Sequence, residues 1–184
     1  MYNWDELNHF ITNCKKCTLC VNRNQVVLGK GNRRAKLFFI AEAPGKQEDL
    51  QGTPFVGPAG QLLDKLLNDV SLNRKDIYIS NVVKCRPPNN RDPLSKEKNA
   101  CLPFLRYEAA LIQPNIIVCL GRVAAQAIIN PHYKITQEHG QWIERKDCFL
   151  TSTFHPAAVL RDPDKMLDVK KDFLKIKDKY NSLL

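Results

Sequence analysis

The sequence predicts an α/β protein in which helices cover both faces of a parallel sheet. Four short segments are rich in β-branched and aromatic residues and almost continuously apolar, which is typical of strands buried on both faces. They span Lys36 to Ala41, Ile77 to Val83, Asn115 to Leu120 and Cys148 to Phe154. Segments of helical period separate them. Strands that alternate with helices require crossover connections, which favour parallel pairing.

The segments between the strands have the residue spacing of helices. After Gly60, apolar side chains recur at intervals that place them on one helix face: Leu62, Leu63, Leu66, Leu67 and Val70. A second helix is expected within Ser95 to Gln113, with Pro103 either in its first turn or at a kink. A third helix follows Gly121, and a fourth runs from about Asp164.

Length and composition limit the class of protein. A chain of 184 residues with 43% hydrophobic residues is long enough for one buried core and short for two, so we expect a single domain over residues 1–184. No apolar run approaches the ~20 residues that span a bilayer, and the N-terminus lacks the pattern of a signal peptide. We therefore expect a cytoplasmic protein without membrane contact. Nothing indicates an interface helix, so we expect a monomer.

The net charge favours a polyanionic partner. The chain has 28 Lys and Arg against 19 Asp and Glu, a formal charge of +9, and such an excess attracts nucleic acid. Many basic proteins bind no nucleic acid, so charge alone leaves both alternatives open. The candidate phosphate contacts are Arg86, Arg91, Arg161 and the basic stretch from Lys30 to Lys36. For that stretch, a solvated loop is the alternative.

Three side chains that can bind a ligand or transfer a proton lie at or just after the ends of predicted strands. Glu42 comes directly after the first strand, Asn81 ends the second, and His155 follows the fourth. In parallel α/β sheets, ligands bind beyond the carboxyl ends of the strands. The Asn81 amide offers a donor and an acceptor, which can match the pairing edge of a pyrimidine. A lone Asn more often forms a turn and a lone His is more often structural, so position is what favours a functional role.

A loop rich in Gly and Pro carries an aromatic residue at a position poorly suited to the hydrophobic core. Phe55 lies within Pro54 to Gly60, where its ring could either stack on a base or cap the hydrophobic core. The sequence leaves these two alternatives open. The turn at Pro44 and Gly45, after Glu42, can bring backbone close to a bound ligand.

Seven cysteines in a chain without an export signal argue for metal, redox or buried-thiol roles. Four of them, two close together and two from a distant segment, suit either iron-sulfur or zinc ligation. The candidate ligands are Cys14, Cys17, Cys85 and Cys101. The absence of a second C-x2-C pair favours iron-sulfur. Cys20 is a competing ligand, and Cys119 and Cys148 are predicted to be buried inside strands.

Together these segments resemble family 4 uracil-DNA glycosylases. The resemblance covers nearly the whole chain, and the four cysteines stand in the same motif context. The motifs are EAPG at Glu42 to Gly45, PFVGPAGQLLD at Pro54 to Asp64, SNVVKCRPPNNRDP at Ser80 to Pro93, and HPAAVLR at His155 to Arg161. The family implies a three-layer α/β/α fold with a four-stranded parallel sheet and cleavage of the N-glycosidic bond of deoxyuridine in DNA. It also implies a 4Fe-4S cluster on Cys14, Cys17, Cys85 and Cys101.

The resemblance further implies a role for each residue of the sheet edge. Phe55 would stack under uracil, Asn81 would read its pairing edge, and His155 would contact a uracil carbonyl. Glu42 would orient or activate the attacking water. The backbone from Ala41 to Ala43 would close on the base.

One departure from the family and two rival functions complete the expectations. The segment from His155 to Arg161 resembles the loop that enters the duplex, but Ala41 stands where the family more often has Gly. Its methyl group puts in question the preference among uracil and its 5-substituted analogues.

The rival functions are a non-catalytic DNA-binding or polymerase-associated module and a zinc-stabilised nucleotide-binding protein. The complete set of Glu42, Phe55, Asn81 and His155 favours a monofunctional glycosylase of base excision repair.

Overall fold

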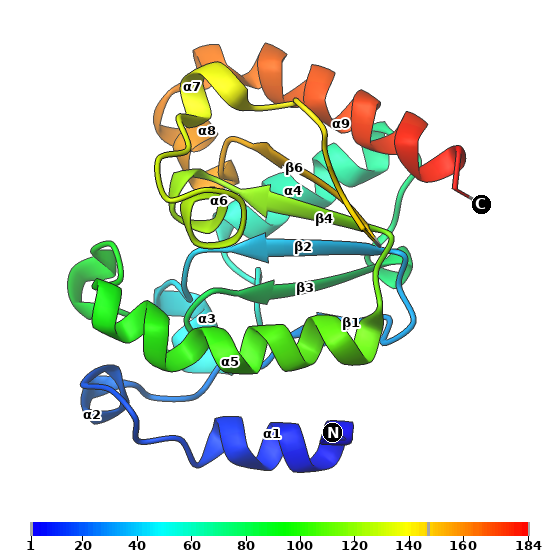
Figure 1. Cartoon of the computed structure of the whole chain (residues 1–184). Helices are drawn as coiled ribbons and strands as arrows, with labels where there is room; N and C mark the ends of the chain where they lie inside the picture. The colour runs from blue at the N-terminus through cyan, green and yellow to red at the C-terminus, as the bar shows by residue number, and fades with distance from the viewer. Residues whose placement is uncertain (1, 147, 184) are drawn as a thin grey trace.

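One mixed sheet organises the protein, whose computed structural model describes residues 2–146 and 148–183. Within these residues, six strands pair in the order β1-β3-β2-β4-β6-β5 (Figure 1). Their bounds are β1 (Lys30–Gly31), β2 (Leu37–Ala41), β3 (Ile77–Asn81), β4 (Ile116–Leu120), β5 (Ile143–Arg145) and β6 (Cys148–Thr153). The four middle strands are parallel, and β1 and β5 pair antiparallel at the two edges. The α/β prediction is confirmed, with the strand count corrected from four to six among the described residues.

The two edge strands are too short to leave a pattern in the sequence. β1 has two residues, both exposed, and β5 has three, of which none is buried. Neither therefore shows the alternation or the apolar run by which a strand is recognised. In contrast, β2 and β3 are buried at every position, which is why their composition predicts them.

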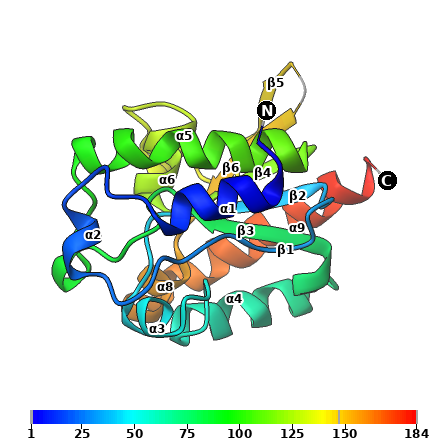
Figure 2. The ribbon, with the colours of Figure 1, turned by 90° about the horizontal axis from the view of Figure 1, so that it is seen from below.

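Helices cover both faces of the sheet (Figure 2). The helices α1 (Trp4–Thr12), α5 (Ser95–Ile112) and α6 (Arg122–Ile128) pack on one face, and α4 (Pro58–Asp69), α8 (Pro156–Arg161) and α9 (Met166–Asn181) pack on the other. The shorter helices are α2 (Leu19–Asn22), α3 (Lys46–Gln51) and α7 (Ile135–Glu138). In the part of the chain that the structure describes, no helix combines the length and apolar character needed to span a bilayer.

Alternate side chains of each strand point into two different cores. In β2, Phe38 belongs to the core under α1 and α5. Its neighbour Phe39 belongs to the core under α4 and α9, where its ring stacks on that of Phe173 with centroids 6.0 Å apart. Because both cores contain fully buried aromatic and aliphatic side chains, the sheet is held rigidly between two helical layers.

The predicted helices are present with shifted ends. α4 begins at Pro58, two residues before Gly60, because proline fits the first helical turn, where its missing N–H is not needed. α9 begins at Met166, since a single 3-10 turn precedes it. Pro103 lies inside α5, so the alternative that placed it in the first turn is wrong.

The N-terminal helix α1 is fixed by local hydrogen bonds and by packing. The Asn3 side chain accepts a hydrogen bond from the backbone N–H of Glu6 at 2.9 Å, and the Glu6 carboxylate accepts one from the Asn3 N–H at 2.9 Å. This reciprocal cap satisfies donors that the first turn of a helix otherwise leaves free. Leu7 and Ile11 are buried in the core that α1 shares with α5. α1 therefore anchors the segment that carries Cys14.

Candidate active site

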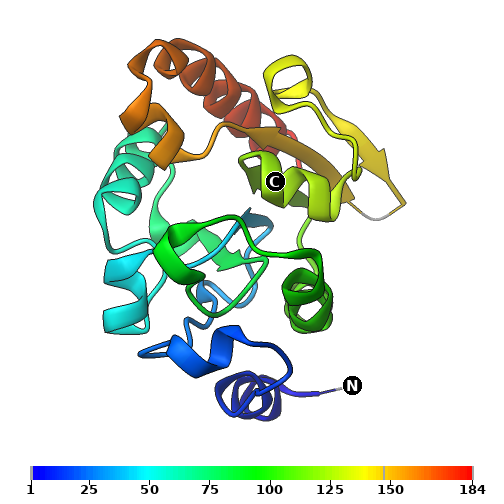
Figure 3. The same cartoon turned by 90° about the vertical axis from the view of Figure 1, so that its left-hand side faces the viewer.

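A cavity of about 350 Å³ opens at the carboxyl ends of β2, β3 and β6, on the edge of the sheet that faces the viewer in Figure 3. Its size is that of a small-molecule site. The predicted residues that line it are Glu42, Ala43, Phe55, Asn81, Arg91, His155 and Arg161. The structure thus brings together side chains from four distant segments. Ala41 is fully buried in β2 and Arg86 is not in the lining.

Asn81 presents an unpartnered acceptor to this cavity. It is the last residue of β3, paired with Ala41 of β2, and its side chain is buried. Among the described residues, its Oδ1 has no hydrogen-bond partner. An unsatisfied buried acceptor costs about 1–3 kcal/mol. The amide is therefore ready to accept a hydrogen bond from a ligand.

His155 is a neutral imidazole with a defined tautomer. It caps the N-terminus of α8, and its Nδ1 accepts a hydrogen bond from the backbone N–H of Ala157 at 3.1 Å. Burial, together with the nearby Arg161 charge, lowers the pKa of His155 to about 4. At neutral pH the ring is uncharged with its proton on Nε2, which is thus a hydrogen-bond donor.

Gly121 allows the close approach of this histidine. Gly121 has a φ of +90°, and a Cβ added to it would lie 2.9 Å from the Cβ of His155. Its N–H also donates to the carbonyl of Thr153 at 2.8 Å. The turn after β4 therefore packs directly against the end of β6 because it carries no side chain.

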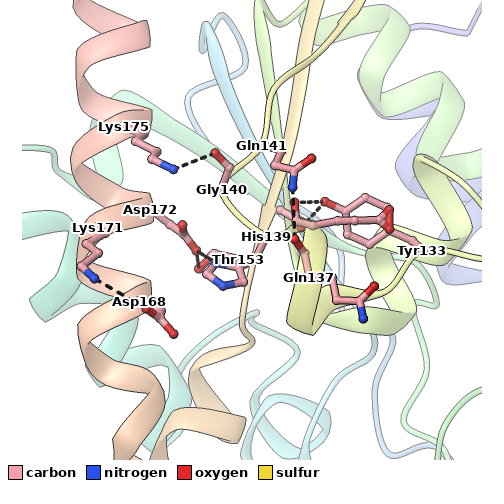
Figure 4. A network of polar contacts seen from close by, with 12 residues as sticks. Tyr133, Gln137, His139, Gly140, Gln141, Thr153, Asp168, Lys171, Asp172 and Lys175 are labelled. Carbon is pink, nitrogen blue, oxygen red and sulfur yellow. Dashed lines mark hydrogen bonds and ion pairs between the residues drawn. The ribbon is translucent and has the colours of Figure 1, made fainter.

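A buried polar network holds the end of β6 in place (Figure 4). Asp172 of α9 accepts a hydrogen bond from Thr153 Oγ1 at 2.7 Å, and the same oxygen lies 2.8 Å from Nδ1 of His139. The backbone N–H of Gly140 donates to the carbonyl of Ser152 at 2.8 Å. These contacts tie α9 and the segment after α7 to the end of β6, the strand that His155 follows.

Glu42 is a carboxyl group that titrates near neutral pH. It follows β2 and is half-buried. Burial, and then the negative charge of Asp92, raise the pKa of Glu42 to about 7, while Arg122, Lys98 and Arg161 act in the opposite direction. Because the acid and the carboxylate are then both populated at neutral pH, the group can exchange a proton with water or substrate.

Phe55 belongs to both the core and the cavity. It is 7% exposed and packs in the core under α4, yet it also lines the cavity. Its ring centroid lies 5.8 Å from that of His155, with the two planes 30° apart. Its φ is +56°, a left-handed conformation that bulky residues rarely adopt and that often marks a functional site. The two alternatives for Phe55, core cap and stacking platform, are therefore compatible.

Three further residues line the cavity without a role expected from the sequence: Glu48, Asn90 and Asp92. Asn90 and Asp92 stand in the motif from Ser80 to Pro93, whereas Glu48 lies outside every motif. Glu48 lies in α3, where its Oε1 accepts hydrogen bonds from the backbone N–H groups of Val56 at 3.0 Å and Gly57 at 2.9 Å. Nothing in the sequence indicates these contacts, since charged residues in a short helix are ordinarily solvated.

A buried lysine lies next to Asn81. The Nζ of Lys84 donates to the carbonyl of Asn81 at 3.0 Å and to Ser80 Oγ at 2.5 Å, and it pairs with Glu108 of α5 at 2.6 Å. The Lys84 and Glu108 side chains are only 2% and 1% exposed. A buried charge requires such a set of partners. The contacts join the sheet edge to α5, and the Lys84 backbone N–H donates to Sγ of Cys101 at 3.3 Å.

The candidate phosphate contacts are of two kinds, single arginines that bond to neighbouring side chains and the basic stretch from Lys30 to Lys36. Arg91 makes two hydrogen bonds to the buried Glu97, at 2.7 and 2.8 Å, while 37% of its side chain stays exposed. Arg86 donates to Asn90 Oδ1 at 2.8 Å. The stretch from Lys30 to Lys36 leads into the amino end of β2. Lys30 pairs with Ile79 in the middle of β3, and the residues after Gly31 run on toward the amino ends of the strands, away from the cavity. For those residues the solvated-loop alternative is favoured.

The four candidate cysteine ligands meet at a second, smaller cavity. Cys14, Cys17, Cys85 and Cys101 line a space of about 20 Å³ together with Cys20. Arg23 Nη1 donates to Cys85 Sγ at 3.2 Å, and burial raises the pKa of Cys101 to about 11. Within the described ranges, no three His, Cys, Asp or Glu side chains are close enough together to hold a metal ion. The donor set, thiols of five cysteines that line one cavity, nevertheless fits a thiolate-bound group.

The remaining two predicted buried cysteines differ from each other. Cys119 lies in the middle of the sheet in β4 and is fully buried, as predicted. Cys148 lies in a strand, as predicted, but it is only half-buried, so the prediction of a buried residue is wrong there. It is the first residue of β6, next to the short edge strand β5, and the sheet is less covered at that corner.

Comparison with known proteins places this chain in a family. A family model described as the Uracil DNA glycosylase superfamily matches residues 28–181. The type-4 uracil-DNA glycosylase of Archaeoglobus fulgidus is 44% identical, over 96% of this chain and 92% of that protein. The type-4 enzyme of Thermotoga maritima is 42% identical, over 88% of each chain. A DNA polymerase of Bacillus phage SP01 is 27% identical over 73% of this chain, which corresponds to only 15% of the polymerase.

Both the family match and the relatives cover the residues that line the cavity. The matched region extends from before β1 to the end of α9, so it includes the strand ends that carry Glu42, Asn81 and His155. Relatives at about 40% identity extend the match to nearly the whole chain. The chain belongs to the uracil-DNA glycosylase superfamily, and within it to the type-4 uracil-DNA glycosylases, enzymes that hydrolyse N-glycosyl bonds.

Proposed function

We propose that this chain flips deoxyuridine out of DNA and hydrolyses its N-glycosidic bond in base excision repair, releasing uracil and leaving an abasic site. The observation that carries the proposal is the buried, unpartnered Oδ1 of Asn81, which lines one cavity with Glu42 and His155. We further propose that it acts as a cytoplasmic, single-domain monomer, and that Arg86, Arg91 and Arg161 contact phosphates.

Asn81 would select uracil by hydrogen bonding. In the proposed complex, its Oδ1 accepts the N3–H of uracil and its Nδ2 donates to O4. Cytosine offers an acceptor at N3 and a donor at the neighbouring position, so both groups of Asn81 would face the wrong partner. A site built on hydrogen bonds rejects a substrate that leaves its buried groups unpaired.

Exchanging Asn81 for aspartate reverses part of this pattern. The Asn81→Asp variant loses the Nδ2 donor and gains an acceptor for the exocyclic amine of cytosine. We expect the ratio of uracil release to cytosine release to fall by about 10- to 100-fold, the range that one well-placed pair of hydrogen bonds contributes to base discrimination. The measurement is single-turnover base release from two oligonucleotides that differ only in the target base. An unchanged ratio would contradict the recognition role.

His155 and Glu42 would act on the two charges that appear as the bond breaks. Negative charge develops on the base and positive charge on the sugar. The Nε2–H of His155 is a fixed donor for a uracil carbonyl, and its ring is already held by Ala157. The Glu42 carboxylate would stabilise the sugar cation and hold the attacking water. The backbone of Ala41 to Ala43 would close on the base.

We also propose that Cys14, Cys17, Cys85 and Cys101 bind a 4Fe-4S cluster. The four thiols line one cavity, and Cys85 and Cys101 accept hydrogen bonds of the kind that stabilise cluster thiolates. When bound, the cluster would cross-link the segment after α1 to α5 and to the turn after Asn81. No step of the hydrolysis requires it.

The cluster can be tested by its ligands. In the Cys101→Ser variant we expect loss of iron, of sulfide and of the brown absorbance at about 400 nm that thiolate-to-iron charge transfer gives, together with a lower Tm. Cys20→Ser is the matched control and should keep the iron, because Cys20 is not in the proposed ligand set. A Cys101→Ser protein with full iron content and an unchanged Tm would contradict the assignment.

A non-catalytic module on the same fold is the second candidate. It is favoured by the similarity to a segment of the phage SP01 DNA polymerase. Base release distinguishes the two, since a binding module would bind uracil-containing DNA without releasing uracil.

A further inference from the structure

Phe55 is held in an unfavourable backbone conformation by its surroundings. Its φ of +56° lies in the left-handed region, where the side chain of a non-glycine residue crowds the backbone. Such a conformation persists only if neighbouring groups fix it. The contacts that do so act on the two peptide groups that follow the Phe55 Cα.

Arg74 holds the carbonyl of Phe55. Its Nη2 donates to this oxygen at 2.7 Å, and its Nε is in turn paired with Asp64 of α4 at 2.5 Å. Gly60 provides the space for the same carbonyl, since a Cβ added at Gly60 would lie 2.0 Å from the oxygen. The guanidinium and the missing side chain together fix one orientation of this peptide group.

Glu48 holds the N–H side of the same Phe55–Val56 peptide group and the N–H of the peptide group that follows it. Its Oε1 accepts hydrogen bonds from the N–H of Val56 at 3.0 Å and of Gly57 at 2.9 Å. Both are charge-assisted bonds, which are stronger than bonds between neutral groups. Glu48 comes from α3 and Arg74 from the 3-10 turn before β3, so two separate elements fix the loop.

We propose that Glu48 and Arg74 are positioning residues that preset the Phe55 ring for stacking on the flipped base. The inference rests on the proposed function. A ring that is already in place loses no conformational freedom when the base binds, and binding is tighter for that reason. We call Glu48 and Arg74 the clamp. Because Phe55 would touch the base and not the breaking bond, loss of the clamp should weaken base binding much more than it lowers kcat.

A double-mutant cycle tests whether Glu48 acts through Phe55. The variants are Glu48→Ala, Phe55→Ala and the double variant, assayed on a single-stranded oligonucleotide with one deoxyuridine so that duplex opening does not contribute. The readouts are the inhibition constant of free uracil, KM and kcat. Phe55→Ala should raise the inhibition constant about 10- to 100-fold, the range of base–aromatic stacking. Glu48→Ala should raise it about tenfold, and adding it to Phe55→Ala should change it by less than about twofold.

Two further variants separate positioning from folding. Arg74→Met removes the hydrogen bond to the Phe55 carbonyl, on the opposite side of the peptide group from Glu48, and should also raise the inhibition constant. Glu48→Gln keeps an oxygen acceptor and should recover most of the lost affinity. Glu6→Ala is the matched control, because the Glu6 carboxylate also accepts a backbone N–H, that of Asn3 at 2.9 Å, but at the start of α1. It should leave uracil inhibition unchanged, with thermal unfolding reporting stability.

The outcomes distinguish this inference from the function on which it rests. Non-additive effects of Glu48→Ala and Phe55→Ala, with kcat nearly retained, support the clamp. Additive effects, or a Glu48→Ala defect confined to kcat, overturn it and indicate that Glu48 contacts substrate or water directly. If Phe55→Ala alone leaves uracil inhibition unchanged, the stacking role fails and the clamp fails with it. If no variant releases or binds uracil and the unaltered protein does not either, the proposed function itself is contradicted.

Discussion

Replacing His155 with alanine is expected to lower the single-turnover rate of uracil release by about 10²–10³, the usual effect of removing one fixed donor from a developing anion. The physical reason is the preset tautomer. The backbone N–H of Ala157 occupies Nδ1, so the Nε2–H is a donor before substrate arrives. Burial keeps the ring neutral by lowering its pKa to about 4.

The His155→Ala experiment has an internal control in the same chain. His132 lies exposed in the loop after α6, so His132→Ala should retain the full rate. The ratio of rates between the unaltered protein and His155→Ala should stay constant between about pH 6 and pH 8, because a group with a pKa near 4 does not titrate there. A ratio that grows as the pH falls toward 5 would indicate a charged imidazolium and contradict the neutral-donor role.

The Glu42→Gln variant should lose about 10²–10⁴ in single-turnover rate, the range for a positioned base. Glutamine keeps the size of the side chain but can neither carry the negative charge nor take a proton from water. A variant that kept most of its single-turnover activity would remove Glu42 from the mechanism and leave water positioning to other groups.

The rate should also depend on pH through Glu42. Its pKa is raised to about 7, mainly by burial and then by Asp92, so the required carboxylate is lost as the pH falls below about 7. The rate should therefore rise with pH through this range and level off above it. Asp92→Asn removes a negative charge, which should lower the pKa of Glu42 and move the profile to lower pH. A profile that is flat from pH 5 to pH 8 would contradict the role of the anion.

The sequence predicts the parts of the fold that local pattern determines. The four parallel strands are recognisable because β2 and β4 are apolar at every position and β3 and β6 begin with three apolar residues. Glu42, Asn81 and His155 could be selected since parallel strands bring their carboxyl ends to one edge. β1 and β5 could not be predicted, because two or three residues, none of them buried, show no periodic pattern.

Other features depend on tertiary partners that no local pattern shows. Glu48 and Lys84 are charged residues, and only the folded structure reveals that Glu48 binds a loop backbone and that Lys84 is buried beside Glu108. The basic stretch from Lys30 to Lys36 has the composition of a phosphate-binding segment, yet after Gly31 it runs toward the amino ends of the strands, away from the cavity. The fully buried Ala41 lies below the cavity lining, so its methyl group is not a wall of the pocket.

The central claim is that this cavity excises uracil, and one assay tests it most directly. Single-turnover release of free uracil is measured from a labelled oligonucleotide with one deoxyuridine, using anaerobically purified protein beside the His155→Ala variant. We predict release of free uracil and an alkali-labile abasic site, with His155→Ala slower by about 10²–10³. No release from iron-loaded protein would contradict the account and favour a module that binds DNA without cleaving it.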